Sequence, residues 1–341
     1  MIGRNAGLLL AAGALGAAGA LAFRKKRINL AGQTVLITGG SRGLGLALAR
    51  EFGTQGCKLA ICARDGEELK RARQLLAEDG YETFTVVCDV SSQADVNRMV
   101  AKVCEHYGQI DILVNNAGEI LVAPFENTTV SDFESAMNVM FWGGLYTTLA
   151  VLPEMKARGC GRIAAITSIG GKVSVPHLLA YSCAKAASVA LYEGLRAELS
   201  KDGIRVTTIA PGLMRTGGHV QARFKGKHES EFAWFSAGAS LPLISMSAER
   251  AASQIVSAVR SGRSERILSS QANLLARLNG AVPGLVPQIL EIVNRFLPNG
   301  TNDSRTTIKG IDLANEQGKL MRTLTALGNS AGSNLNQPTT A

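Results

Sequence analysis

From Gln33 onward, short apolar runs rich in β-branched residues alternate with longer segments in which apolar residues recur every three or four positions. The short runs predict strands at residues 34–38, 58–63, 84–89, 112–115, 162–168, 204–210 and 266–269. The longer segments predict helices at residues 44–54, 67–78, 93–107, 131–156, 181–200 and 248–260. This alternation predicts an α/β fold, a doubly wound, Rossmann-like parallel sheet of about seven strands with helices on both faces. The ligand-binding crevice of such a sheet lies at the carboxyl ends of its strands.

The N-terminus departs from this pattern. Residues 6–23 carry no charge, Arg4 precedes them, and four basic residues, 24–27, follow. Eighteen apolar residues are about the minimum for a membrane span, and basic residues stay on the cytoplasmic side. We expect residues 1–27 to be a membrane anchor that leaves the catalytic domain on the cytoplasmic side. A peripheral or oligomerising segment, or a signal peptide cleaved after Ala22, are the alternatives.

The C-terminal third also differs from the middle of the chain. Residues 28–270 are expected to form one catalytic domain. Residues 271–298 are apolar but interrupted by prolines, which predicts an extension of short amphipathic helices broken by turns. Residues 299–341 are rich in Gly, Asn, Ser and Thr. We expect a polar, partly disordered tail there, with no fixed structure in the last dozen residues.

Composition narrows the classes of function. With 46% hydrophobic residues, the 341-residue chain can bury a large core, which excludes wholesale disorder. The net charge of +9 includes the basic run beside the apolar segment, and no nucleic-acid-binding motif accompanies it, so we expect no nucleic-acid partner. The six cysteines are scattered, which favours a reduced compartment over a disulfide framework. The four histidines do not combine with cysteines at metal-ligand spacing, so no metal is expected.

A glycine-rich turn joins the first predicted strand to the first predicted helix. It reads Thr38-Gly39-Gly40-Ser41-Arg42-Gly43-Leu44-Gly45. Glycines let backbone N–H groups approach a pyrophosphate, and the helix N-terminus favours its negative charge. Glycine-rich turns also serve tight packing, so the position of this turn after the first strand of an α/β pattern is what predicts a dinucleotide site.

Several motifs follow this turn in a recognisable order. They are T-G-x-x-x-G-x-G from Thr38, an acid at Asp89, N-N-A-G at 115–118, Ser168 thirteen residues before Tyr181, Y-x-x-x-K ending at Lys185, and P-G-x-x-x-T from Pro211 to Thr216. Jointly they resemble the short-chain dehydrogenase/reductase family over about residues 30–266. The resemblance implies an oxidoreductase that interconverts an alcohol and a carbonyl, a homo-oligomer, and a catalytic set of Ser168, Tyr181 and Lys185. It implies dinucleotide contacts from Thr38, Gly39, Ser41, Arg42, Gly43, Leu44, Gly45, Arg64, Asp89, Val90, Asn115, Ala117, Gly118, Tyr181, Lys185, Pro211, Gly212 and Thr216.

The chemistry of the tyrosine motif also follows from its spacing. Tyr181 and Lys185 share a helix face, and a nearby ammonium is expected to lower the tyrosine pKa from about 10 toward neutrality. A phenol with such a pKa works as a general acid or base, and Ser168 can donate a hydrogen bond to the substrate oxygen. An ordinary surface pair of Tyr181 and Lys185 is the alternative that the other motifs disfavour.

One position departs from the family's pattern. Met140 stands where the family usually has an asparagine that helps to hold a water near the lysine. Asn138 is close in sequence, but two positions along a helix point about 160° apart, so Asn138 cannot substitute. This departure puts the proton relay in doubt. It also keeps open a membrane-tethered NADP(H)-binding sensor or scaffold with little turnover, or a membrane-organising protein whose nucleotide site is only structural.

The second predicted strand bears on cofactor choice. It ends in Ala63-Arg64, where NAD enzymes of this fold often place an acid. Arg64 and Arg42 are expected to clamp a 2′-phosphate, which favours NADP(H), with NAD(H) still possible. Asp65 lies where a ribose-binding acid is sometimes found, but we expect it to cap the following helix.

Residues 219–243 are expected to form a substrate lid. Their aromatic residues, Phe224, Phe232, Trp234 and Phe235, lie among basic residues, as suits a small lipophilic substrate that enters from a membrane surface. Closure over the nicotinamide or packing in a dimer interface would explain the same aromatics.

Overall fold

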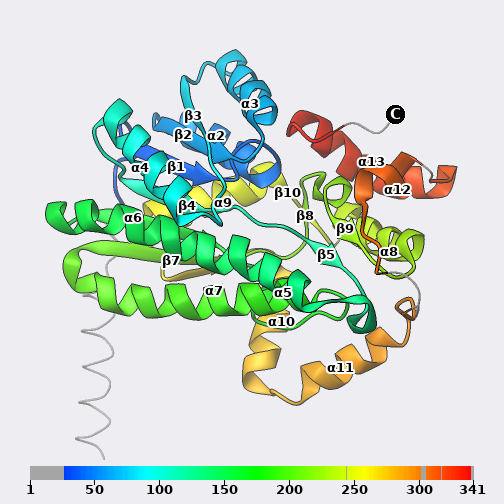
Figure 1. The fold of residues 1–341 in the computed structure, drawn as a ribbon. Coiled ribbons are helices and arrows are strands. Elements are labelled where there is room, and N and C mark those ends of the chain that lie inside the picture. Colours follow the sequence, from blue (N-terminus) through cyan, green and yellow to red (C-terminus); the bar gives the residue numbers. More distant parts are fainter. Residues whose placement is uncertain (1–26, 243, 301–304, 316, 339–341) are drawn as a thin grey trace, which may run out of the picture.

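A seven-stranded parallel sheet forms the centre of the protein (Figure 1). The computed structural model describes residues 27–242, 244–300, 305–315 and 317–338. The strand order is β11-β7-β6-β4-β1-β2-β3, with bounds β1 (Thr34–Thr38), β2 (Lys58–Ala63), β3 (Thr83–Val87), β4 (Ile112–Asn115), β6 (Gly161–Ile166), β7 (Ile204–Ala210) and β11 (Glu265–Ile267). The predicted fold is therefore confirmed, and four of the seven strands have the predicted bounds.

Helices cover both faces of the sheet, and each face has its own apolar core. On one face, α2 (Gly43–Thr54), α3 (Gly66–Glu78) and α9 (Ala248–Arg260) pack around fully buried residues such as Phe52 and Ile255. On the other, α4 (Gln93–Tyr107), α6 (Gly143–Arg158) and α7 (Leu179–Glu198) enclose residues such as Met99, Met155 and Tyr192. Two-sided burial explains why β1 is buried along its whole length and carries a continuous apolar run, Val35-Leu36-Ile37, rather than an alternating pattern.

The helix predicted at residues 131–156 is not continuous. It consists of α5 (Val130–Met137), a π-helical turn at Asn138–Trp142, and α6. A π turn inserts one residue into the helix and changes the direction of the following side chains. Both sides of the turn keep a helical apolar pattern, so periodicity alone could not detect it.

A second layer covers the carboxyl ends of the strands. Its elements are β5 (Leu121–Val122), β9 (Arg223–Phe224) and β12 (Ile308–Lys309) in one small sheet, β8 (Met214–Arg215) with β10 (Met246–Ser247), and α8 (His228–Ser240), α12 (Gly310–Asn315) and α13 (Lys319–Asn334). Short 3-10 turns occur at Phe125–Asn127, Ile169–Gly171, Leu199–Asp202 and Gly218–Val220. Phe224, Phe232 and Phe235 are buried in one cluster with Leu313 of α12. These aromatics of the expected lid thus pack within the chain.

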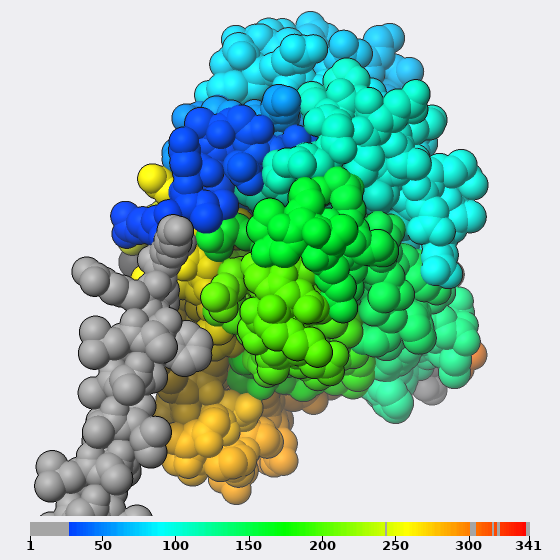
Figure 2. All heavy atoms as spheres, turned by 90° about the vertical axis from the view of Figure 1, so that its left-hand side faces the viewer, coloured from blue at the N-terminus to red at the C-terminus, as the bar shows by residue number. Residues whose placement is uncertain are grey.

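Two helices follow β11. They are α10 (Ser270–Ala281) and α11 (Leu285–Asn294), and Figures 1 and 2 show them in orange as a lobe at the lower end of the molecule. The anchor expected at residues 1–27 lies, apart from Arg27, outside the described part of the chain. Among the described residues, no helix has the length and apolar character needed to cross a bilayer.

The expectation of an unstructured C-terminus is wrong for residues 330–338. Helix α13 runs to Asn334, and Leu335 is only 1% exposed within the core beside α2. Polar composition suggested disorder, but a single apolar anchor and several hydrogen bonds to the main domain hold this segment in place.

Candidate active site

The glycine-rich turn between β1 and α2 has the close approaches that a dinucleotide site requires. Gly39 has φ +63°, and a Cβ there would lie 2.9 Å from the Ala117 Cα. A Cβ on Gly45 would lie 2.1 Å from the Gly39 carbonyl oxygen, so only glycine fits at either position. The N–H groups of the first turn of α2 have no intrahelical partner. The Gly43 N–H donates to the Leu335 carbonyl oxygen, and those of Leu44 and Gly45 suit the pyrophosphate of a dinucleotide.

Asn116 holds this turn against the end of β4. Its Nδ2 donates to the carbonyl oxygens of Thr38 and Gly39, both at 3.0 Å, while the Thr38 hydroxyl accepts from the backbone N–H of Asn116 at 3.0 Å and of Ala117 at 3.1 Å. Asn116 belongs to the N-N-A-G motif, yet it is absent from the expected site residues. The motif was the signal that could have identified it.

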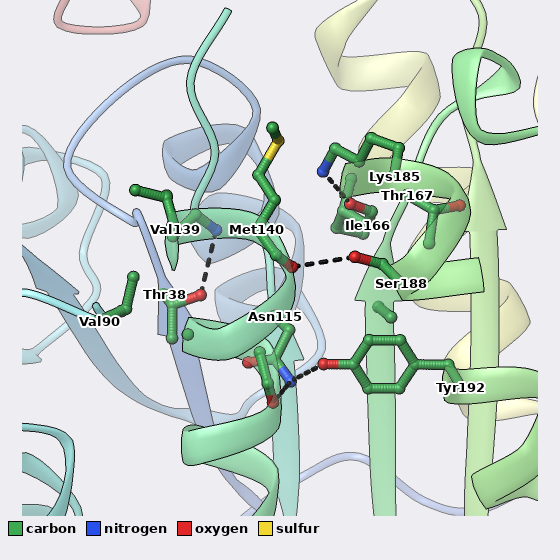
Figure 3. Close-up of a pocket in the computed structure, with 14 residues that line it drawn as sticks. Thr38, Val90, Asn115, Val139, Met140, Ile166, Thr167, Lys185, Ser188 and Tyr192 are labelled. Atoms are coloured by element: carbon green, nitrogen blue, oxygen red, sulfur yellow. Dashed lines mark hydrogen bonds between the residues drawn. The ribbon is translucent and has the colours of Figure 1, made fainter. Parts of the chain in front are cut away.

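Asn115, in contrast, directs its side chain into the protein. Its Nδ2 donates to the Tyr192 hydroxyl at 2.8 Å, and its Oδ1 accepts from the Thr147 hydroxyl at 2.6 Å. Figure 3 shows this buried network beneath the candidate site. The side chain of Asn115 therefore fixes β4 against α6 and α7.

The three expected catalytic residues come together at the end of β6. Ser168 and Tyr181 lie side by side, since the Tyr181 ring and the Ser168 hydroxyl are 3.3 Å and 3.4 Å from the Cβ position of Gly170. The Ser168 hydroxyl accepts from the Gly170 N–H at 3.0 Å. Lys185, one helical turn after Tyr181, lies with its Nζ 5.7 Å from the centroid of the tyrosine ring. The structure thus joins Ser168 to the phenol and the amine of the Y-x-x-x-K motif.

The electrostatics of this group differ from the expectation. Burial raises the pKa of the Tyr181 phenol, although the neighbouring Ser168 hydroxyl acts in the opposite direction. Burial also lowers the pKa of Lys185 to about 8, and its Nζ donates to the Ile166 carbonyl oxygen at 2.7 Å. The expected lowering of the tyrosine pKa by the lysine is therefore absent from this structure, because desolvation dominates at both groups.

Met140 occupies the wall beside Lys185. It is buried in the π turn, whereas Asn138 is exposed, so Asn138 does not substitute for the missing asparagine. The Met140 carbonyl oxygen accepts from the Ser188 hydroxyl at 3.0 Å (Figure 3). Met140 and Lys185 line a cavity of about 10 Å³, which is close to the minimum that holds one water.

The adenosine end of the expected site is arranged around Glu68. Arg42 pairs with the Glu68 carboxylate, and the Ser41 hydroxyl donates to that carboxylate at 3.2 Å. Arg64 is exposed at the end of β2 and makes no ion pair among the described residues. Asp65 caps α3 as expected, since its Oδ1 accepts from the Glu67 and Glu68 N–H groups at 2.9 Å. Of the two arginines of the expected phosphate clamp, Arg42 is thus engaged by Glu68.

The remaining expected contacts lie at neighbouring strand ends. Asp89, just after β3, accepts from the Ser91 N–H at 2.9 Å, and Val90 lines the small cavity. The Pro211 carbonyl oxygen accepts from the Ile169 N–H at 2.8 Å, which ties the turn after β7 to the Ser168 segment. Thr216, at the end of that turn, lies 3.7 Å from the Cβ position of Gly43, so the two turns face each other.

A larger cavity of about 600 Å³ adjoins the segment that leads into Tyr181. Its wall combines residues 172–179 with the 3-10 turn Phe125–Asn127 and with α11, including Val173, His177 and Val286. His177 is buried, and its Nδ1 lies 2.9 Å from the carboxylate of Glu231, which also accepts from the Trp234 Nε1 at 2.8 Å. The volume and mixed lining suit a small organic molecule.

Comparison with known proteins agrees with this geometry. Residues 33–225 match the family profile described as short chain dehydrogenase. A "Dehydrogenase/reductase SDR family protein 7-like" of Anopheles gambiae is 41% identical over 193 residues, covering 55% of this chain and 61% of the relative. An "11-beta-hydroxysteroid dehydrogenase-like 2" of Arabidopsis thaliana is 31% identical over 267 residues, covering 78% of this chain and 82% of the relative.

A crystal structure of a short-chain dehydrogenase from Streptomyces avermitilis matches with a TM-score of 0.66 and 30% identity, covering 77% of this chain and 98% of that chain. The chain spans 61% and 60% of the lengths of the dehydrogenase/reductase relatives from Anopheles gambiae and Drosophila melanogaster.

Proposed function

The chain belongs to the short-chain dehydrogenase family, and on that premise we propose that it is an NAD(P)(H)-dependent oxidoreductase that interconverts an alcohol and a carbonyl. The observation that supports this activity is the meeting of Ser168, Tyr181 and Lys185 at the end of β6, where the turn after β7 is tied to the Ser168 segment. The glycine cradle fits a dinucleotide, which supplies the hydride when bound.

Each catalytic residue has a distinct task in this proposal. Tyr181 gives the substrate oxygen its proton in reduction and removes it in oxidation. Its raised pKa keeps the phenol protonated at neutral pH, so the isolated site is poised as a general acid. Ser168 holds the substrate oxygen and Tyr181 in line, and Lys185 orients the cofactor from the same helix face.

The second candidate is a membrane-tethered NADP(H)-binding sensor or scaffold with little turnover. Met140 supports it, because a thioether cannot hold a water by a strong hydrogen bond beside Lys185. Cofactor fluorescence titration of the purified chain, followed by a screen of carbonyls of increasing chain length for NADPH oxidation, separates the two. Turnover supports the enzyme, cofactor binding without turnover supports the sensor, and failure to bind either cofactor contradicts both.

We propose NADP(H) as the preferred cofactor, with Arg64 as the principal contact for the 2′-phosphate. Arg64 is exposed at the end of β2, whereas Arg42 is already paired with Glu68. We expect Arg64→Ala to raise the Kd for NADPH by about tenfold or more and to leave NADH binding nearly unchanged, because a charge-assisted hydrogen bond is lost.

Parallel titrations with both cofactors measure this effect, and Arg73→Ala, an exposed arginine of α3, controls for net charge. The single substitution Glu68→Gln should tighten NADPH binding, because it removes the carboxylate that pairs with Arg42. Tighter binding of NADH than of NADPH by the unmodified chain would overturn the assignment.

We also propose a lipophilic substrate and a membrane association that places the catalytic domain on the cytoplasmic side. The expected anchor contributes to this proposal, and so does the lobe of α10 and α11 (Figure 2), where large apolar side chains are exposed: Leu274, Val282, Leu285, Ile289, Ile292, Val293 and Phe296. Such a surface suits insertion at a lipid interface near the 600 Å³ cavity, part of whose wall is α11.

Fractionation tests this association. The full chain should sediment with membranes, and deletion of residues 1–26 should increase the soluble fraction. In that shortened chain, Ile292→Ser with Phe296→Ser should reduce flotation with phosphatidylcholine vesicles several-fold, because two exposed apolar groups are lost. Val130→Ser removes an equally exposed apolar group from a different surface and should change nothing. Equal flotation of all three forms would contradict the role of the lobe.

A further inference from the structure

The last described residues of the chain lie against the glycine-rich turn. The Leu335 carbonyl oxygen accepts from the Gly43 N–H at 2.9 Å, at the first position of α2. The Leu335 side chain is buried in the same core cluster as Leu44. Figure 1 shows α13 in red, coming from the second layer to reach this side of the sheet. The contact joins residues almost 300 positions apart, so it is a feature of the tertiary structure alone.

Asn336 binds the glycine-rich turn and α3 together. Its Nδ2 donates to the carbonyl oxygens of Ser41 at 2.8 Å and Glu68 at 3.0 Å, and its Oδ1 accepts from Arg71 at 3.3 Å. The backbone of Asn336 is left-handed, with φ +57°, which asparagine tolerates better than most residues. Both carbonyls belong to residues at the expected adenosine end, so Asn336 fixes the shape of that end.

Gln337 bridges the two turns that face each other across the expected cofactor site. Its Nε2 donates to the Thr216 carbonyl oxygen at 3.1 Å and lies 3.2 Å from the Cβ position of Gly43. The residue is 8% exposed, and its Oε1 is buried without a hydrogen-bond partner among the described residues. A buried acceptor without a donor is costly unless a bound molecule supplies one.

We infer that the segment Leu335–Gln337 is a third wall of the dinucleotide site. Asn336 positions the glycine-rich turn, and Gln337 offers its free acceptor to a hydroxyl or amide donor of the bound cofactor. This inference rests on the proposed cofactor use and deepens it. It makes Asn336 a positioning residue, and it makes the C-terminus a part of the enzyme that cofactor binding requires. If the segment only blocked the site, loss of its contacts would tighten cofactor binding instead of weakening it.

Two substitutions in the full chain test this role without removing the buried Leu335. Asn336→Gly keeps the left-handed backbone and removes the amide, and Gln337→Met keeps the volume and removes both polar atoms. Each should raise the Kd and KM for the preferred cofactor by about tenfold while kcat stays within about twofold, since the catalytic group is untouched. Asn334→Ala, an exposed side chain in the same segment, should leave both unchanged.

The outcomes separate this inference from the proposed function. A lower melting temperature with unchanged cofactor Kd would reduce the segment to a structural role and overturn the inference, while turnover still supports the oxidoreductase. Tighter cofactor binding in Asn336→Gly or Gln337→Met would overturn it in favour of a blocking segment. Weaker binding in both variants of a protein that shows no turnover would support the inference and contradict the enzyme. No binding by the unmodified chain would overturn both.

Discussion

Replacing Tyr181 by phenylalanine should lower kcat by about 10²–10⁴-fold and change the cofactor Kd by less than about twofold. The substitution removes one hydroxyl, on the side chain that lies beside Ser168, and keeps the ring that packs beside Met140. Because the hydroxyl acts only in proton transfer to or from the substrate oxygen, the loss should fall on the chemical step. Steady-state kinetics and cofactor fluorescence titration on the same preparation measure the two quantities.

A second tyrosine provides the matched control. Tyr146 of α6 is partly buried and stacks on Trp142 with ring centroids 6.2 Å apart. Tyr146→Phe makes the same chemical change away from Ser168, and kcat should remain within about twofold of the unmodified protein. If Tyr181→Phe retained most of its kcat, Tyr181 would not be the general acid or base.

Replacing Lys185 should reduce activity by a comparably large factor and should also weaken cofactor binding. We expect Lys185→Met to reduce kcat/KM by about 100-fold or more and also to weaken cofactor binding, because the amine sits between the tyrosine ring and the end of β6. Lys201→Met removes an exposed lysine and should have little effect on either. Unchanged cofactor affinity in Lys185→Met would contradict its dual role.

Lys185 also gives the protein a pH dependence of defined sign. Its pKa is about 8 in the folded protein, below the unfolded value of about 10.4. The unfolded chain therefore binds more protons than the folded protein between these values, so this group makes stability rise as pH increases through that window. Denaturant unfolding at pH 7, 8, 9 and 10 should show a smaller rise for Lys185→Met than for the unmodified protein. Equal slopes would show that burial does not depress this pKa.

Local patterns along the chain were enough to predict the α/β fold and the identity of the chemical groups. Strand and helix periods are local, and the seven strands follow from short runs that are buried on both sides. The glycine turn and the Tyr181–Lys185 spacing likewise depend on near neighbours, so they could be recognised without knowing the packing. The capping role of Asp65 was predictable for the same reason, because its partners are two and three residues away.

The tertiary structure alone decided the electrostatics and the boundary of the site. The spacing in the sequence places Lys185 beside Tyr181, but it does not give the direction of either pKa shift. Burial sets both directions: it raises the pKa of the phenol and lowers the pKa of the amine. From the sequence, Arg42 could be assigned to the 2′-phosphate of the cofactor. Its pairing with Glu68 depends instead on how α3 packs against the glycine-rich turn. The docking of Leu335–Gln337 could not be predicted from the sequence for the same physical reason. Its hydrogen bonds join segments far apart in the chain, and no local propensity reports which distant surface will satisfy a polar tail.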